Sequence, residues 1–290
     1  MVRGIDVHVH IATGDKVRTG RRPVFPTGVD PRWDNPDAIA ELYASLELMA
    51  VIFDVDNETQ SGLRISNQEV AQWVEKYPEV FIGFGSVDPW KGRRAVEEVR
   101  RCAELGLRGM KFQQITQAFR PDDPRFFPIY EACVDQGLAV LFHTGTTAIG
   151  VGRPGGMGLR LDYGRPIYVD EVAARYPELR IILAHPAWPW HDEQLAIVRH
   201  KGNVYMDLSG WAPKYFPPSV VHYANTLIQD KVLFGSDYPM ITPQRWLEEF
   251  TDLPLKEEVR RKILLVNAAR FFGLQLPGIE ETAAEARKEA

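Results

Sequence analysis

The sequence predicts a single (β/α)8 barrel of the TIM type, an α/β fold with long loops after several of its strands. Eight short apolar runs alternate with amphipathic helical stretches along the 290 residues, which is the pattern of parallel strands joined by helical crossovers. No Gly-x-Gly-x-x-Gly run follows any of these strands, so an open dinucleotide-binding sheet is not favoured. A closed barrel of eight units is therefore the expected architecture.

The predicted strands and helices follow one another in regular order. Continuous apolar runs such as Leu138-Ala139-Val140-Leu141-Phe142 indicate strands that helices cover on the outer face. The strands are expected at Ile5 to His10, Ala50 to Val55, Phe81 to Val87, Gly109 to Phe112, Ala139 to His143, Arg180 to Ala184, Val204 to Asp207 and Val232 to Gly235. The clearest helices are expected at Asn67 to Tyr77, Arg93 to Leu105, Phe126 to Gln136, Ile167 to Tyr176 and Asp192 to Lys201.

Four connections that follow strand ends are long for a compact domain, which is typical of functional loops. They are Ile11 to Asn35, Gln113 to Arg125, Thr144 to Arg165 and Leu208 to Pro218. The barrel is expected to occupy residues 1–276. Residues 277–290, rich in Glu, Ala and Lys, are expected to form a charged C-terminal tail to which no chemistry is assigned.

Composition narrows the class of partner. The chain is 45% hydrophobic and 25% charged, with a formal net charge of −5, which favours a small-molecule substrate over nucleic acid or an anionic membrane. Its two cysteines, Cys102 and Cys133, have no Cys-x-x-Cys spacing, which argues against a zinc ribbon or a disulfide framework. With no signal-peptide pattern and no membrane-spanning run, a cytoplasmic location is expected.

Metal-competent side chains stand at the ends of four predicted strands. His8 and His10 alternate with Val9, so in a strand both point to the same side. His143, His185 and Asp237 follow the fifth, sixth and eighth strands. Singly, each could cap a carbonyl or bond turn amides. Together they are expected to converge, because the carboxyl ends of all barrel strands meet at the face where barrel active sites are built.

The segments around these residues resemble the amidohydrolase superfamily, and within it the amidohydrolase-related (amidohydrolase 2) group that includes aminocarboxymuconate semialdehyde decarboxylase. The resemblance spans nearly the whole chain and agrees with the barrel fold. Its motifs are Ile5-Asp6-Val7-His8-Val9-His10, Leu141-Phe142-His143-Thr144-Gly145, Leu183-Ala184-His185-Pro186, Leu233-Phe234-Gly235-Ser236-Asp237-Tyr238-Pro239 and Asn267-Ala268-Ala269-Arg270-Phe271-Phe272-Gly273-Leu274.

The resemblance implies a metal centre with an acid/base beside it. It makes four side chains the ligands of one divalent ion, expected to be Zn²⁺: His8, His10, His143 and Asp237. It gives His185 and Asp237 the catalytic roles, with His185 moving the proton. Asp6 is expected to share the inward face of the strand with His8, as a buried supporting partner. The resemblance also suggests a homodimer.

Further side chains are candidates for binding the substrate. Lys111 lies on the fourth strand, where it could be a carbamylated residue bridging two metal ions, a substrate-binding ammonium or half of a structural ion pair. Trp188 and Trp211 follow the sixth and seventh strands and could form aromatic pocket walls or pack as lid residues. Arg153, on a long loop, could bind a carboxylate or be solvated.

The leading functional hypothesis is a metal-dependent hydrolase that opens an amide, ester or lactone bond with a metal-activated hydroxide. The alternative is non-oxidative decarboxylation of an aromatic or muconate-like acid at the same metal site. The segment Pro186-Ala187-Trp188-Pro189-Trp190 lacks the glycine-rich run associated with the muconate decarboxylase, and this favours hydrolysis. A second alternative is a non-catalytic metal- or ligand-binding barrel.

Overall fold

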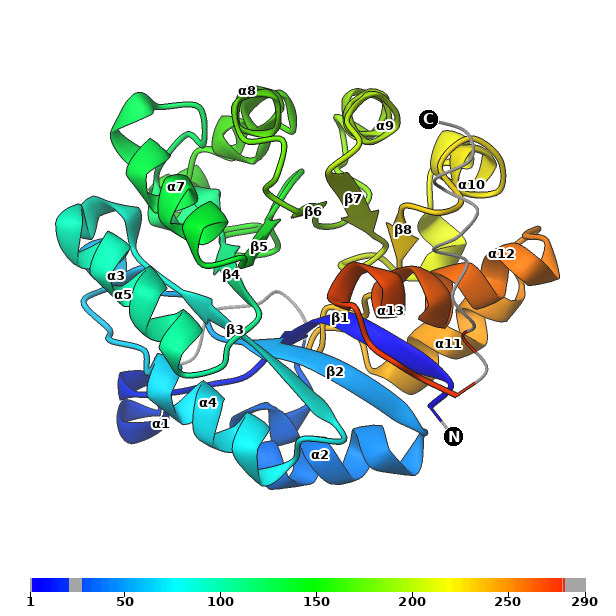
Figure 1. Cartoon of the computed structure of the whole chain (residues 1–290), viewed down its shortest axis with the longest axis horizontal. Helices are drawn as coiled ribbons and strands as arrows, with labels where there is room; N and C mark the ends of the chain where they lie inside the picture. The colour runs from blue at the N-terminus through cyan, green and yellow to red at the C-terminus, as the bar shows by residue number, and fades with distance from the viewer. Residues whose placement is uncertain (1, 21–27, 278, 280–290) are drawn as a thin grey trace.

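The computed structural model of the chain describes residues 2–20, 28–277 and 279. Its centre is a parallel eight-stranded sheet in which each strand pairs with the next along the chain (Figure 1). The strands are β1 (Gly4–His10), β2 (Leu48–Phe53), β3 (Phe81–Ser86), β4 (Gly109–Phe112), β5 (Ala139–Phe142), β6 (Ile181–Leu183), β7 (Val204–Asp207) and β8 (Val232–Leu233). The predicted (β/α)8 barrel is confirmed.

The sheet closes between its first and last strands. The backbone N–H of Val7 donates to the carbonyl of Phe234 over 2.9 Å, and that of His10 donates to the carbonyl of Tyr238 over 2.8 Å. In the opposite direction, the N–H of Asp237 donates to the carbonyl of His8 over 3.1 Å. β8 itself is only two residues long, so the segment that follows it completes the seam between β8 and β1.

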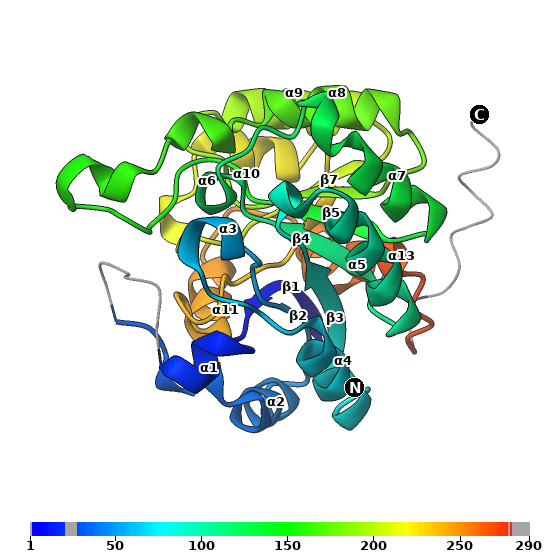
Figure 2. The same ribbon diagram turned by 90° about the vertical axis from the view of Figure 1, so that its left-hand side faces the viewer.

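Helices surround the barrel and cover the outer face of the strands (Figures 1 and 2). The α-helices are α1 (Asp15–Thr19), α2 (Pro36–Ser45), α3 (Glu58–Ser61), α4 (Asn67–Lys76), α5 (Arg93–Glu104), α6 (Gln114–Gln117), α7 (Phe127–Asp135), α8 (Ile167–Arg175), α9 (His191–His200), α10 (Pro218–Ala224), α11 (Pro243–Thr251), α12 (Glu257–Arg261) and α13 (Asn267–Phe272). Shorter helical turns are η1 (Pro31–Asp34), η2 (Pro89–Lys91), η3 (Pro124–Phe126), η4 (Pro154–Gly158), η5 (Leu161–Gly164), η6 (Pro213–Tyr215) and η7 (Lys262–Val266). No helix in the described ranges is long and apolar enough to cross a membrane.

Two apolar layers hold the molecule together. The larger layer lies between the strands and the helices, and the smaller one fills the barrel interior with alternate strand residues such as Val51 and Leu141. Phe271 and Phe272 of α13 belong to the interior layer and close it at the amino ends of the strands. Arg108 and Arg180 fix this helix by donating hydrogen bonds to its last carbonyls.

A β-bulge in β1 decides which way its histidines point. Asp6 is paired with Ala50 and Val9 with Ile52, so β1 advances three residues while β2 advances two. Before the bulge Val7 faces the barrel interior, and after it Val9 belongs to the outer layer. The extra residue therefore reverses the alternation and turns His8 and His10 inward.

The same bulge corrects the expectation for Asp6. Its carboxylate accepts hydrogen bonds from the hydroxyl of Tyr43 on α2 and from the backbone and hydroxyl of Ser236, so it lies on the outer face of β1 and not on the inward face with His8. It is nevertheless a fully buried partner of the site, because it also accepts the backbone N–H of His8 over 3.1 Å.

The long loops contain short helices of their own. The connection from β5 to α8 holds η4 and η5 and projects from the barrel as the bright green segment of Figure 2.

The observed bounds of the strands differ most from the predicted ones at β2, which ends at Phe53 and not at Val55. Beyond Phe53 the Asp54 side chain accepts hydrogen bonds from both the N–H and the hydroxyl of Thr13. The predicted C-terminal tail, residues 277–290, lies almost wholly outside the described residues.

Candidate metal centre and acid/base

Three side chains from the closing seam bring metal-competent atoms together at the carboxyl end of the barrel. His8 Nε2 lies 3.3 Å from His10 Nε2, and Asp237 Oδ1 lies 3.2 Å from each of these nitrogens. Ligand atoms bonded to one ion at about 2.0–2.2 Å are separated by roughly 3.0–3.5 Å. The spacing of this triangle therefore fits a single divalent ion.

The backbone conformations of His185 and Asp237 direct their side chains toward the site. His185 follows β6 with φ at 67°, and Asp237 follows β8 with φ at 65°. Left-handed conformations are uncommon for residues with a side chain and occur where the surroundings hold them. At His185 this conformation carries the ring inward, although the preceding residue, Ala184, already faces the barrel interior.

The protonation states of the triangle suit metal binding. Burial and, to a smaller extent, the charge of Lys111 lower the pKa of His8 to about 4. Burial disfavours the ionised form of Asp237, but the hydrogen bond from His10 and the neighbouring imidazoles outweigh it and hold the pKa of Asp237 well below its usual value. Near neutral pH, His8 thus offers a lone pair and Asp237 a carboxylate, which are the ligand forms that a cation requires.

His143 and His185 form a second group beside the triangle. The His185 ring lies 4.8 Å, between centroids, from the rings of both His8 and His143. His143 Nε2 lies 3.0 Å from the carbonyl of Thr146, which can only accept, so this nitrogen carries the proton and Nδ1 is left with its lone pair. That Nδ1 faces His185 Nε2 across 3.1 Å.

Two buried side chains of this region have no counterpart in the sequence prediction. Asp207 Oδ2 accepts the Nδ1 proton of His8 over 3.0 Å, and Asp207 Oδ1 accepts the backbone N–H of His185 over 3.1 Å. The hydroxyl of Ser209 lies 2.8 Å from His185 Nδ1. Among the described residues, two groups have ligand atoms all within 4.8 Å of one another: His8, His10 and Asp237, and His8, His185 and Asp207. The nitrogen of His8 that faces Asp207 already donates a hydrogen bond, so the second group is a hydrogen-bonded support for the first.

The proposed substrate contacts lie in three different environments. Lys111 is fully buried with Nζ 3.2 Å from His8 Nε2, and burial lowers its pKa to about 8. Trp188 is 51% exposed, and its ring centroid lies 6.3 Å from that of Trp211. Arg153 is exposed on the projecting loop between β5 and α8. The structure thus brings Lys111 to the histidines and places the tryptophans together.

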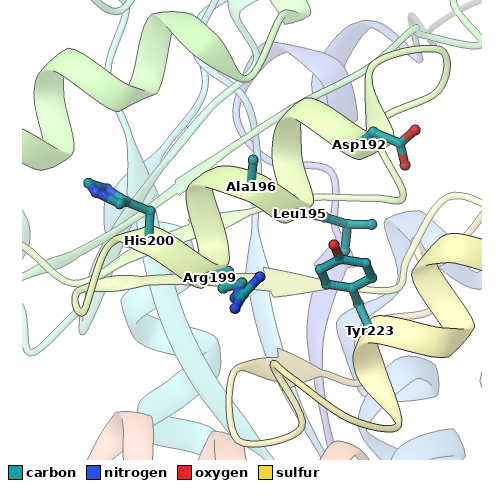
Figure 3. Close-up of a pocket in the computed structure, with 6 residues that line it drawn as sticks. All are labelled: Asp192, Leu195, Ala196, Arg199, His200 and Tyr223. Atoms are coloured by element: carbon teal, nitrogen blue, oxygen red, sulfur yellow. The ribbon is translucent and has the colours of Figure 1, made fainter.

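A groove of about 690 Å³ lies on the outside of the barrel, away from these residues. It runs between α9 and α10 and is lined by Asp192, Leu195, Ala196, Arg199, His200 and Tyr223 (Figure 3). His200, a helical histidine that does not belong to the strand-end set, is one of its exposed walls. None of the metal-competent residues at the strand ends borders it.

A family model described as Amidohydrolase matches residues 5–274, which is nearly all of the chain. The chain belongs to the amidohydrolase family. The resemblance noted in its motifs is therefore confirmed, and this member of the family is an enzyme and not only a binding barrel. The match includes all eight strands, except for Gly4 at the start of β1, and all the residues of the candidate site.

Named relatives place this amidohydrolase-family chain close to decarboxylases. It is 27% identical over 283 residues to the 2-amino-3-carboxymuconate-6-semialdehyde decarboxylase of Dictyostelium discoideum, a match covering 83% of this chain and 77% of the relative. An uncharacterised TIM-barrel protein from Bordetella bronchiseptica superposes with a TM-score of 0.76 and 25% identity, over 93% of this chain and 98% of that one. A 5-carboxyvanillate decarboxylase from Novosphingobium aromaticivorans, determined with manganese and 3-methoxy-4-hydroxy-5-nitrobenzoic acid, has a TM-score of 0.69 and 19% identity, over 94% and 97% of the two chains.

These relatives overturn the leading functional hypothesis. The expectation of a hydrolase is wrong, since both named enzymes are decarboxylases. The departure in the loop after β6, which favoured hydrolysis, therefore does not exclude decarboxylation. The alternative, decarboxylation at the same site, is the one that the relatives support.

Proposed function

We propose that this protein is a metal-dependent, non-oxidative decarboxylase of a small aromatic or muconate-like carboxylic acid. The observation that carries the proposal is the position of His185. Its ring packs against His8 of the ligand triangle and presents Nε2 toward His143. An acid/base beside a metal-binding group is what proton delivery to a substrate carbon requires, and the named relatives catalyse decarboxylations.

The residues present fit a divalent ion. His143 Nδ1 and His185 Nε2 face each other at 3.1 Å as two lone pairs, and their mutual repulsion is relieved when a cation binds His143. We propose that four side chains hold the ion: His8, His10, His143 and Asp237. A nitrogen and oxygen donor set suits either Zn²⁺ or Mn²⁺. When bound, the ion supplies positive charge that orients an anionic substrate and stabilises negative charge developing on it.

The protein's own side chains then perform the proton transfer. Burial lowers the pKa of His185 to about 4, so its Nε2 is unprotonated at rest and takes up a proton together with the anionic substrate. As the bond from the carbon to its carboxylate breaks and CO₂ leaves, the electron pair stays on that carbon. His185 Nε2 gives its proton to the carbon, which yields the product R–H from R–COO⁻ and one proton.

Other residues shape the pocket around this step. We propose that Trp188 and Trp211, which lie together beside the barrel mouth, form an apolar wall for a planar substrate. Lys111 and Arg153 are the proposed cationic contacts for substrate carboxylates. The buried ammonium of Lys111 lies nearest the ligand triangle, so it is the stronger candidate of the two.

The test is a substrate screen with the purified protein loaded with Zn²⁺ or Mn²⁺. Hydroxybenzoates and muconate-like acids are supplied while CO₂ is measured, and the reaction is repeated in D₂O. The expected result is CO₂ release with one deuterium at the carbon that lost its carboxylate. His185→Asn should retain the ion by elemental analysis but lose a factor on the order of 10² in rate. CO₂ release at an unchanged rate in that variant would exclude His185 as the acid, and no CO₂ from any acid with either metal would refute the reaction.

A further inference from the structure

The end of β7 carries two fully buried polar side chains, Asp207 and Ser209, that lie against both groups of histidines. The Asp207 carboxylate uses both oxygens. Oδ2 accepts from the ring of His8, while Oδ1 accepts the backbone N–H groups of His185 and Ser209 over 3.1 and 2.9 Å, together with the Ser209 hydroxyl. One carboxylate thus connects the metal-binding ring of His8 with the acid/base residue.

The hydrogen bonds around Ser209 have a definite direction. A hydroxyl has one proton to donate, and Ser209 donates it to the Asp207 carboxylate, which only accepts. Toward His185 Nδ1, 2.8 Å away, the same oxygen must therefore accept. The proton of the neutral His185 ring then resides on Nδ1, and the lone pair resides on Nε2, which is the nitrogen directed at His143.

The backbone holds the ring of His185 in this orientation from its other sides. Gly210 has φ at 74°, and a Cβ atom on it would lie 2.5 Å from His185 Nδ1, so the chain approaches the ring closely at this point. The carbonyl of His185 accepts a hydrogen bond from the Gln194 side chain over 2.8 Å. These contacts leave the ring little freedom to flip and exchange its two nitrogens.

We propose that Asp207 and Ser209 are positioning residues, which keep the proton of resting His185 on Nδ1 and hold Nε2 toward the substrate, and that Asp207 orients His8 in the same way for the metal. The catalytic part of this inference rests on the proposed decarboxylase function. Ser209 acts on His185 alone, whereas Asp207 acts on both rings. Substituting the two residues therefore has different consequences.

The proposal is tested by ¹⁵N NMR of histidine-labelled protein loaded with diamagnetic Zn²⁺, with the His185 signal identified by its loss in His185→Asn. Wild-type His185 is expected to show its proton on Nδ1. Ser209→Ala should give a mixture of the two tautomers, and the conservative Ser209→Thr should restore the wild-type signal. Ser86→Ala is the matched control: it removes a fully buried serine hydroxyl that bonds to the backbone of Asp56 and Lys111 and not to the rings of His8 and His185, and it should leave the signal unchanged.

Metal content and kinetics separate the two roles. Loss of a residue that orients a ligand or a catalytic ring costs about 10–100-fold. For Ser209→Ala we expect this loss in kcat, with KM and metal affinity unchanged, and for Asp207→Asn an additional loss of this size in metal affinity. A wild-type His185 proton on Nε2, or an unchanged signal in Ser209→Ala, overturns the proposal. The NMR result requires no turnover, so a failure of the decarboxylase assignment is distinguished from a failure of the positioning roles.

Discussion

His185 reaches the mouth of the barrel through a backbone conformation that residues with side chains seldom adopt. Its position after a predicted strand was visible in the sequence, as were those of His8, His10 and Asp237, because strand ends can be located from apolar runs. Asp207 was visible only as the last residue of a strand. Its role depends on the hydrogen bond from the ring of His8, which is 199 residues away in the sequence, and no local pattern indicates such a contact.

The two cysteines allow a prediction at the residue scale. Burial raises the pKa of the Cys102 and Cys133 thiols well above the ordinary value. A raised pKa keeps a thiol protonated as the pH rises, and the thiolate is the reactive form. In native protein at pH 8, a disulfide reagent such as Ellman's should therefore modify neither thiol within minutes, and both should react after unfolding in guanidinium chloride. Rapid titration of one thiol without denaturant would contradict this.

At the scale of elements, the β1 bulge is the feature that hydropathy could not reveal. A strand with strict alternation would place Ile5, Val7 and Val9 on one face and Asp6, His8 and His10 on the other, which is the arrangement expected from the sequence. The bulge interrupts this alternation, so Val7 and His8 both point into the barrel interior. Asp6 instead accepts a hydrogen bond from Tyr43 on the outer face. Pairing between strands fixes such an irregularity, and a single strand's residues do not encode it by themselves.

Close packing between strands gives a prediction at this scale. A Cβ atom on Gly109 of β4 would lie 2.4 Å from the Phe84 ring and 2.8 Å from the backbone carbonyl of Ala139. Gly109→Ala should therefore lower the free energy of unfolding by about 1–3 kcal/mol, measured by urea denaturation. Gly202→Ala is the matched control, because nothing lies within 4 Å of the added methyl group and the residue has no positive φ. Equal stability of the two variants would contradict the packing argument.

At the scale of the whole molecule, the fold was predictable and the reaction was not. Eight alternating units allow one closed architecture, which is why the barrel and its active face followed from the sequence. Hydrolysis and decarboxylation would both use the proposed ligand set at that face, and they would differ in the substrate that the surrounding loops admit. Loop residues such as Trp188 and Arg153 carry no periodic pattern that would identify this substrate.

The ligand triangle spans the seam where the barrel closes, so metal binding should stabilise the entire fold. A ligand that binds only the native state at 100 times its Kd adds about 2.7 kcal/mol, which corresponds to a rise in Tm on the order of 5 °C for a chain of this size. Differential scanning calorimetry with and without Zn²⁺ or Mn²⁺ should show this rise. His10→Ala is expected to lose most of it, since it removes one corner of the triangle. An identical rise in the variant would exclude the triangle as the binding site.

The closing seam also determines when the chain can become active during its synthesis. Asp6 accepts hydrogen bonds from Ser236, 230 residues later, and the histidine pair of β1 meets its carboxylate partner in the same segment. Contacts this distant in sequence form late, because the intervening chain must first be ordered. On the ribosome, His8 and His10 leave the exit tunnel before Asp237 and have no carboxylate of the seam to meet until the eighth strand follows them. The ligand triangle therefore cannot assemble until all eight strands have been synthesised, when α11, α12 and α13 still follow in the chain.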